Sequence, residues 1–221
     1  MPSPSEIWRR NHPWAAIYSF ALAHPPLAIA GGATIGTDIR LLYRAAEKIG
    51  EIANGSVVLD VPCGAGVALR GLRPDQKLRY IACDISSAML ERTGREAERR
   101  GLGQVELLEG DIANLPFDDG EIDVCLSFTG LHCVPRPRDA VLEIARVVKP
   151  GGAISGSLLL ADAPFYRRHV LIGGRAAGLI GPSATQQEIL DWLAEAGFDD
   201  IRFERSGDVG YFQAEMPLPP A

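Results

Sequence analysis

The chain has 221 residues, 47% of them hydrophobic and 23% charged, and its formal net charge is -6. A chain of this size and apolar content predicts one sizeable α/β domain with a full core, which argues against two independent domains. The negative charge argues against nucleic acid or an anionic membrane as the main partner, because no global positive field would concentrate polyanions.

The N-terminal residues predict helices that precede the main domain. The apolar run WAAIYSFALAH, residues 14–24, follows two arginines and stops at a Pro-Pro pair, an arrangement that imitates a cleavable leader. It is shorter than the roughly 18 apolar residues of a membrane span, so we expect a helix over an apolar surface and no stable membrane insertion. An amphipathic helix is predicted between Thr37 and Asn54. We expect residues 1–54 to form a cap or lid.

Strands and helices then alternate along the chain. Near-continuous apolar strands that alternate with helices indicate a parallel sheet covered on both faces, which is a doubly wound, Rossmann-like α/β fold. Strands are predicted at residues 57–60, 78–84, 105–109, 122–127 and 153–160, and helices from residue 67, over 86–100 and over 138–148.

The C-terminal part departs from this alternation. A predicted helix over residues 183–196 is followed by two strands, DIRFER and DVGYFQAE, joined through a tight Ser206-Gly207 connection. A parallel return needs a crossover of about a dozen residues or more, so these strands must form an antiparallel hairpin. The main domain is then expected over residues 55–215, with an insertion at 161–182 that could lie over a pocket and a loose tail at 216–221.

The stretch VLDVPCGAG, residues 58–66, is typical of a strand that ends in Asp60 and enters a glycine loop. In an open α/β sheet, ligands bind beyond the carboxyl ends of the strands, normally beside the first strand. Gly64 and Gly66 would let the backbone approach a ligand closely, and the helix that starts near Val67 would present free N–H groups to an anion. From Gly64 the chain reads GAGVAL, so the third glycine of a dinucleotide fingerprint is missing.

Three carboxylates follow successive predicted strands. Asp60 would repel a pyrophosphate but attract an ammonium group, Asp84 is placed to accept both ribose hydroxyls, and Asp111 is placed to accept the exocyclic amine of an adenine. Each could instead cap a turn or a helix, but three at the carboxyl edge of consecutive strands favour a shared ligand. An ammonium group, a ribose and an adenine together describe S-adenosylmethionine.

On these residues the chain resembles the class I S-adenosylmethionine-dependent methyltransferases, and it is most similar to the small-molecule branch with the ubiquinone and menaquinone C-methyltransferases. Six segments in family order carry the resemblance: VLDVPCGAG, YIACDISSAML, EGDIANLPF, IDVCLSFTGLHCV, ARVVKPGG and EILDWLAEAGF. The resemblance implies a seven-stranded sheet whose last strand is antiparallel. It also implies a cofactor site, with Asp60, Cys63, Gly64 and Gly66 around the methionine part, Asp84, Ile85 and Met89 at the ribose and one adenine face, Asp111 and Ile112 at the adenine, and Ser127 and Phe128 as the floor near the methyl group.

Pro62 stands where the family has its first glycine. Proline fixes φ near about -65° and lacks an N–H, so it can replace a glycine only where neither a positive φ nor a donor is needed. We infer that position 62 merely turns the chain off the strand, while Gly64 and Gly66 carry the close approach to the ligand.

Other polar residues have simpler interpretations. The carboxylates of FDDGEID, residues 117–123, are split between two faces by strand alternation, so we expect a solvated turn and no metal site. The mixed-charge run ERTGREAERR is interpreted as the exposed face of a helix. Four scattered cysteines without a CxxC pair indicate free thiols in a reducing, cytoplasmic compartment.

His132, just after the fourth strand, is the best-placed ionisable residue for acid or base work and is the candidate catalytic residue. Its alternative roles are to shape the pocket wall or to bond to backbone.

The sequence therefore predicts in-line transfer of a methyl group from S-adenosylmethionine to a small, partly apolar acceptor, with S-adenosylhomocysteine as product. Such a displacement needs alignment and exclusion of water more than covalent catalysis. The segment SFTGLH lacks the Asn/Asp-Pro-Pro-Tyr/Phe signature of enzymes that methylate DNA amines, so nucleic acid is not expected. An NAD-dependent oxidoreductase would need a GxGxxG helix start, which this chain lacks.

The alternative function is that of a non-catalytic S-adenosylmethionine-binding or scaffold protein. The sequence does not determine the oligomeric state, and a homodimer is one candidate.

Overall fold

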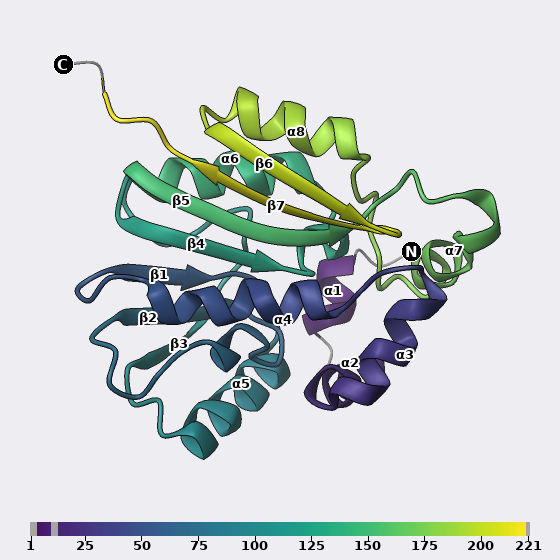
Figure 1. The fold of residues 1–221 in the computed structure, drawn as a ribbon, viewed down its shortest axis with the longest axis horizontal. Coiled ribbons are helices and arrows are strands. Elements are labelled where there is room, and N and C mark those ends of the chain that lie inside the picture. The colour runs from purple at the N-terminus through teal and green to yellow at the C-terminus, as the bar shows by residue number, and fades with distance from the viewer. Residues whose placement is uncertain (1–3, 10–12, 220–221) are drawn as a thin grey trace.

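A computed structural model describes residues 4–9 and 13–219 of the chain, which contain one seven-stranded sheet in the order β3-β2-β1-β4-β5-β7-β6 (Figure 1). β1 pairs in parallel with β2 and β4, β2 with β3, and β4 with β5, whereas β7 is antiparallel to β5 and β6. The predicted mostly parallel sheet with an antiparallel C-terminal hairpin is confirmed. The strands are β1 Val57–Asp60, β2 Arg79–Asp84, β3 Val105–Glu109, β4 Ile122–Phe128, β5 Val148–Leu159, β6 Asp199–Ser206 and β7 Val209–Glu215.

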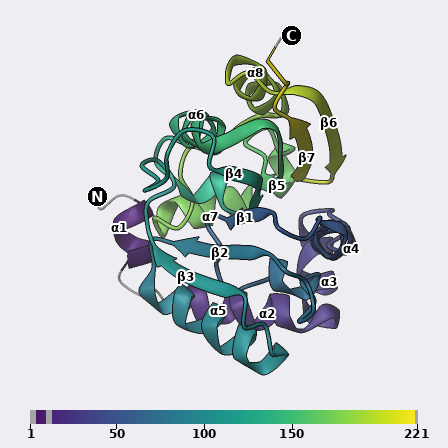
Figure 2. The ribbon, with the colours of Figure 1, turned by 90° about the vertical axis from the view of Figure 1, so that its left-hand side faces the viewer.

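Helices cover both faces of the sheet because the inner strands are apolar on both sides. In β1, Val58 packs into one buried cluster and Leu59 into the other. Figure 2 shows α4 and α5 on one side of the sheet and α6 and α8 on the other. The first side holds α4 Arg40–Glu47, the short 3-10 helices η1 Lys48–Glu51 and η2 Ala68–Arg70, and α5 Ser87–Arg100; the second holds α6 Pro137–Val147 and α8 Gln186–Glu195.

Two helices near the glycine loop are shorter than predicted. The helix expected between Thr37 and Asn54 spans α4 and η1, and the helix expected from residue 67 is the single turn η2. The cause lies at Gly71, where a Cβ atom would stand 1.8 Å from the carbonyl oxygen of Ala46. The chain after η2 therefore runs directly against α4, and this leaves no room to continue the helix.

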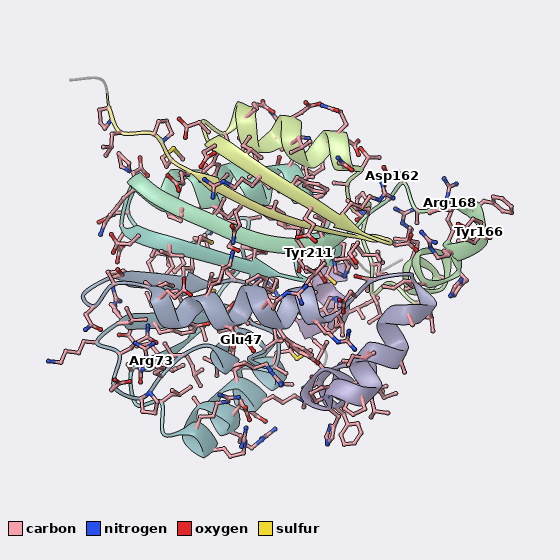
Figure 3. The ribbon with its side chains drawn as sticks, in the orientation of Figure 1. Glu47, Arg73, Asp162, Tyr166, Arg168 and Tyr211 are labelled. Atoms are coloured by element: carbon pink, nitrogen blue, oxygen red, sulfur yellow. The ribbon has the colours of Figure 1, made fainter. Side chains whose placement is uncertain are left out.

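The remaining helices gather at one end of the molecule, on the right in Figure 1, and we call α1 to α3 together with residues 161–182 the end region. It contains α1 Pro4–Arg9, α2 Pro13–Ala23, α3 Pro25–Thr34, η4 Phe165–Arg167 and α7 His169–Ala176. The indole Nε1 of Trp8 in α1 donates to the carbonyl of Leu179 at 3.1 Å. In Figure 3 the side chains of Tyr166 and Arg168 lie at this end.

Arg167 joins the insertion to the tip of the hairpin formed by β6 and β7. Its guanidinium donates to both carboxylate oxygens of Asp208 at 2.9 to 3.1 Å, and that side chain is only 1% exposed. The backbone N–H of Asp208 donates to the carbonyl of Ile35 at 3.1 Å. The insertion, the hairpin and the segment after α3 therefore meet at one buried carboxylate.

The division into a cap at 1–54, a main domain at 55–215, an insertion and a tail stays a prediction. Within it, α4 buries Leu42 and Ala46 against the sheet, whereas α1 to α3 lie in the end region. Of the predicted tail, Met216 exchanges backbone hydrogen bonds with Gly151 and Gly152, and residues 220–221 lie outside the described chain. Over the described residues, none of the helices has both the length and the hydropathy required to cross a membrane.

Candidate functional site

Asp60 closes β1 beneath the glycine loop. Its side chain is 1% exposed, and the hydroxyl of Tyr80 on β2 donates to its Oδ2 at 2.9 Å. Burial raises the pKa of this carboxyl to about 7, the Tyr80 hydrogen bond lowers it, and the neighbouring charge of Asp84 raises it. Burial therefore favours the protonated form of Asp60, and a cation beside it would favour the ionised form.

Asp84 ties the glycine loop to the end of β2. Its Oδ2 accepts the backbone N–H of Gly64 at 2.9 Å, and its Oδ1 accepts that of Ser86, also at 2.9 Å. Burial raises the pKa of the carboxyl to about 6, although these N–H donors act in the opposite direction. Each oxygen keeps a second lone pair, so the carboxylate can still accept two ligand hydroxyls.

The two loop glycines adopt backbone conformations that other residues reach only under strain. Gly64 has φ +55° and Gly66 has φ +79°. A Cβ at Gly64 would meet nothing within 4 Å, so this side of the loop is open to a ligand, whereas at Gly66 it would approach Leu69 at 3.0 Å. The hydroxyl of Thr93 in α5 donates to the carbonyl of Gly64 at 2.9 Å and fixes the loop from behind.

Pro62 is accommodated by a second glycine that sequence reasoning did not single out. A Cβ at Gly130, just after β4, would stand 2.2 Å from Cδ of Pro62. The proline ring therefore occupies the space that any side chain at position 130 would need. No short-range pattern could have revealed this pair, because the two residues are brought together only by the pairing of β1 with β4.

Cys63, Ile85 and Met89 surround the loop. The Cys63 thiol is buried beside Thr93, and burial first, then the charges of nearby carboxylates, raise its pKa well above the usual range, so it is a neutral packing group. Ile85 is half-buried, and Met89 is 4% exposed, with its Sδ 3.9 Å from the hydroxyl of Ser19 in α2. Cys63 thus belongs to the loop, Ile85 follows the Asp84 that bonds to it, and α2 lies against Met89.

Asp111 lies farther from the loop, past the end of β3. Its side chain is 39% exposed, its Oδ1 accepts the backbone N–H of Ala113 at 3.0 Å, and its Oδ2 lies 4.0 Å from the guanidinium of Arg9 in α1. The next residue, Ile112, is buried in the core cluster shared with α6. Asp111 is therefore available to a ligand, whereas Ile112 has mostly protein neighbours.

Ser127 and Phe128 end β4 beside β1. The Ser127 hydroxyl is fully buried and has no hydrogen-bond partner among the residues that the structure describes. Buried hydroxyls are rarely left unpaired. Phe128 is 4% exposed and forms part of the cavity wall next to the glycine loop.

His132 is held by backbone on one side. Its Nδ1 accepts the backbone N–H of Leu159 at 3.2 Å, and burial lowers its pKa to about 4. The neutral ring then carries its proton on Nε2. In this arrangement His132 can donate a hydrogen bond from Nε2, and it could act as a base only after giving up the bond to Leu159.

A cavity of about 680 Å³ opens beside the glycine loop, between α2 and α5. It is lined by loop residues Cys63 to Val67, by Phe128 and Thr129, and by side chains from α2 and α5. Arginines of ERTGREAERR line it as well, so the interpretation of this run as an exposed helix face was incomplete. Their spacing of three and four residues, which puts them on one helical face, was the signal.

The carboxylates of FDDGEID are engaged in ion pairs. Asp119 pairs with Arg146, Glu121 with Arg79, and Asp123 with Lys149, at 2.7 to 3.1 Å. The described residues contain no group of three or more His, Cys, Asp or Glu side chains that could hold a metal ion.

Comparison with known proteins shows what the chain is similar to. Residues 59–155 match the family described as "Methyltransferase domain". The chain is 36% identical over 116 residues to an uncharacterized chloroplastic methyltransferase of Arabidopsis thaliana and 37% identical over 110 residues to demethylmenaquinone methyltransferase of Bacillus cereus. These matches cover 50% and 48% of this chain, but only 33% and 46% of the two relatives, so the chain spans less than half the length of either.

Solved structures share the fold over almost the whole chain. The [4+2]-cyclase SpnF superposes with a TM-score of 0.71 at 18% identity, over 99% of this chain and 97% of SpnF. A protein of Thermotoga maritima described as an S-adenosylmethionine-dependent methyltransferase, possible histamine N-methyltransferase, superposes with a TM-score of 0.65 at 17% identity, over 96% of this chain and 99% of its own. At these identities the similarity establishes the fold alone.

Proposed function

We propose that this chain is a class I S-adenosylmethionine-dependent methyltransferase and that it transfers a methyl group from S-adenosylmethionine to a small-molecule acceptor, because residues 59–155 match a methyltransferase domain and the chain is similar to methyltransferases. The family implies the cofactor. The roles of individual residues and the kind of acceptor are inferred from the geometry of the site.

The observation that carries the proposal is the joint position of Asp60, Asp84 and Gly64. The first two are buried carboxylates with raised pKa values at the ends of adjacent parallel strands. Gly64 hydrogen-bonds to Asp84 and leaves open space on its own Cβ side. A ligand with an ammonium group and two vicinal hydroxyls fits this arrangement, because it would supply a positive charge to Asp60 and donors to Asp84.

Two further features fit the same cofactor. The buried hydroxyl of Ser127 lies at the end of β4 without a hydrogen-bond partner among the described residues, next to Phe128, which lines the cavity. Asp111, which is partly exposed past β3, is placed to accept an exocyclic amine. We assign the methionine part to Asp60, Cys63, Gly64 and Gly66, the ribose to Asp84, Ile85 and Met89, the adenine to Asp111 and Ile112, and the floor to Ser127 and Phe128.

When bound, the cofactor supplies an electrophilic methyl group on a sulfonium, which leaves as a neutral thioether. The residues of this chain align the acceptor with that group and exclude water. The buried ring of Phe128 provides an apolar wall beside the loop. His132 does not line the cavity beside the loop, so its part in the reaction stays a prediction, and an acceptor that is already nucleophilic needs no base.

The alternative is a protein with this fold that does not transfer methyl groups. The fold is shared with a [4+2]-cyclase, so the architecture alone does not select the reaction. A cavity of about 680 Å³ beside the loop favours an enzyme over a scaffold with a blocked acceptor pocket. A cytoplasmic location, a homodimer and the exclusion of nucleic acid remain predictions.

Calorimetric titration of S-adenosylhomocysteine into the purified protein tests the proposal, with NAD as the comparator. We expect micromolar affinity that Asp84→Ala weakens by at least about 100-fold, because two charge-assisted hydrogen bonds to the ribose are lost. The matched control is Glu106→Ala, which removes an exposed carboxylate from the neighbouring strand β3. Equal affinity for NAD, or no binding of S-adenosylhomocysteine to a protein that is folded by circular dichroism, would contradict the proposed function.

A further inference from the structure

The cavity beside the glycine loop has a strongly basic wall. Although the chain has a net charge of -6, the side chains that line the cavity include five arginines and only one carboxylate. The arginines come from η2 and from one face of α5, and they are Arg70, Arg92, Arg95, Arg99 and Arg100, with Glu96 as the single acid.

Protein carboxylates neutralise only part of this charge. Glu96 pairs with both Arg99 and Arg100 at 2.7 Å, and Glu91 lies 3.7 Å from Arg95. These five residues form two separate groups of ion pairs on the surface of α5.

Arg70 and Arg92 have no carboxylate partner in the part of the chain that the structure describes. The guanidinium of Arg70 lies 4.4 Å above the ring of Tyr43, and that of Arg92 donates to the carbonyl of Ala88 at 3.0 Å. Both side chains are half-buried. A half-buried guanidinium with unused donors favours an anion, and its planar fork fits phosphate or carboxylate in particular.

The opposite wall is mostly apolar, with Ser19 and His24 as its polar residues. Helix α2 contributes Ala16, Phe20, Leu22 and Ala23, and the Phe20 side chain is 57% exposed. The volume of about 680 Å³ is typical of a small-molecule pocket. The two walls therefore suit a molecule that has an apolar body and a compact anionic group.

We propose that the acceptor is an amphipathic anion whose phosphate or carboxylate group is bound by Arg70 and Arg92 while its apolar body lies against α2. This inference rests on the proposed function, and it defines the substrate class of that site. One end of the cavity is formed by Gly64 and Phe128, which are assigned to the methionine part and the floor, so a molecule in the cavity reaches the transferred methyl group.

Calorimetry on the full chain tests this with n-octyl phosphate and n-octanoate as probes, each titrated in the presence of saturating S-adenosylhomocysteine. n-Octanol is the neutral control, and a single-stranded oligonucleotide tests the nucleic-acid alternative. We expect saturable, equimolar binding of at least one anionic probe, no detectable binding of n-octanol, and affinity that falls with added salt.

The variant Arg70→Gln/Arg92→Gln should lower the affinity for the anionic probe by at least about tenfold, since each substitution removes a charge-assisted contact. Its affinity for S-adenosylhomocysteine should stay unchanged. The matched control Arg79→Gln/Arg136→Gln removes the same charge outside the cavity, from residues paired with Glu106 and Asp139, and should bind the probe like the wild type. Arg70→Lys/Arg92→Lys keeps the charge and tests whether the forked geometry matters, through partial recovery of affinity.

Three results would each overturn the inference while leaving the proposed function intact. In the first, S-adenosylhomocysteine binds but neither anionic probe does. In the second, the control variant loses as much probe affinity as Arg70→Gln/Arg92→Gln, and in the third, the oligonucleotide binds more tightly than the probes. Displacement of the probe by S-adenosylhomocysteine would place the anion in the cofactor site and would also overturn it. Failure of S-adenosylhomocysteine itself to bind contradicts the proposed function, whatever the probes do.

Discussion

The strand ends around the glycine loop and the end region differ in how their contacts are made. Around the loop, Gly64 bonds to Asp84 and Thr93, which are 20 and 29 residues away, through a compact set of backbone and buried polar groups. In the end region, Trp8 bonds to Leu179 across 171 residues. The loop is thus specified within one strand-loop-strand-helix unit, whereas the end region depends on contacts between distant segments.

The difference extends to charge. The strand ends contain two buried carboxylates with raised pKa values and a histidine with a lowered one. The described residues of α1 to α3 and α7 instead expose the large apolar side chains of Phe20, Leu27 and Ile172. The strand ends thus contain buried polar groups, whereas the end region exposes apolar surface.

The largest effect that separates the two regions is a pH dependence confined to the strand ends. Because the pKa of Asp60 is raised to about 7, the folded state keeps a proton that the unfolded state loses near about pH 4. Its contribution to the unfolding free energy therefore falls as the pH rises from about 4 to about 7, by up to about 1.4 kcal/mol per pH unit. Asp84 acts in the same direction up to about pH 6.

His132 acts in the opposite direction, because its lowered pKa makes the unfolded state bind the extra proton, so stability rises with pH between about 4 and about 6.5. The Asp60 contribution is isolated by urea unfolding of wild type and Asp60→Asn at several pH values. The wild-type free energy minus that of the variant should decline across the window. A difference that is flat, or that increases with pH, would show that Asp60 is already ionised in the folded protein.

The same substitution placed in the two regions should have opposite effects. Gly130→Ala forces a Cβ into the ring of Pro62, so we expect a loss of about 2–3 kcal/mol in unfolding free energy. Gly173→Ala lies within α7, where a Cβ meets nothing within 4 Å, and should stabilise the protein by about 0.5–1 kcal/mol. Urea unfolding of both variants and of the wild type measures these changes in unfolding free energy. Similar changes in the two variants would contradict the expected difference between the regions.

The smallest effect concerns the link between α1 and the insertion. Trp8→Phe removes the hydrogen bond to Leu179 and keeps an aromatic side chain, so it should lower the free energy of local opening by about 1 kcal/mol. Native-state hydrogen exchange should show faster exchange in α1 and α7 together, while amides of β1, β2 and β4 are unchanged. Faster exchange across the whole sheet would mean that the end region is part of the same cooperative unit.

Sequence patterns were sufficient to predict the positions of the strands, because apolar runs, glycine stops and the tight hairpin are local signals. The predicted strands agree with β1, β3 and β6 within a residue at each end, and β5 starts five residues before its predicted start. The number of strands followed from the resemblance, whereas their order was not predicted. The short η2 turn was missed, because it results from the contact between Gly71 and Ala46, which belong to different elements.

At the site, sequence placed the three carboxylates at the ends of β1 and β2 and just past β3, but could not show what they already bind. The bond of Asp84 to Gly64, the bond of His132 to Leu159, and the space shared by Pro62 and Gly130 all join residues from different strands or loops. Their geometry depends on the register of the sheet, which cannot be predicted from any single sequence motif. The roles assigned to these residues remain predictions that the titrations above can test.

The contact between Arg167 and the buried Asp208 bears on how the protein is made. A chain that folds as it leaves the ribosome can pair β1 with β2 and close the glycine loop once about the first hundred residues have emerged. The insertion cannot neutralise Asp208 until the hairpin near the C-terminus has been synthesised, and α1 must wait for Leu179. Contacts of such long sequence separation form slowly. The end region is therefore completed after the glycine loop, although it contains α1, which precedes the loop in the chain.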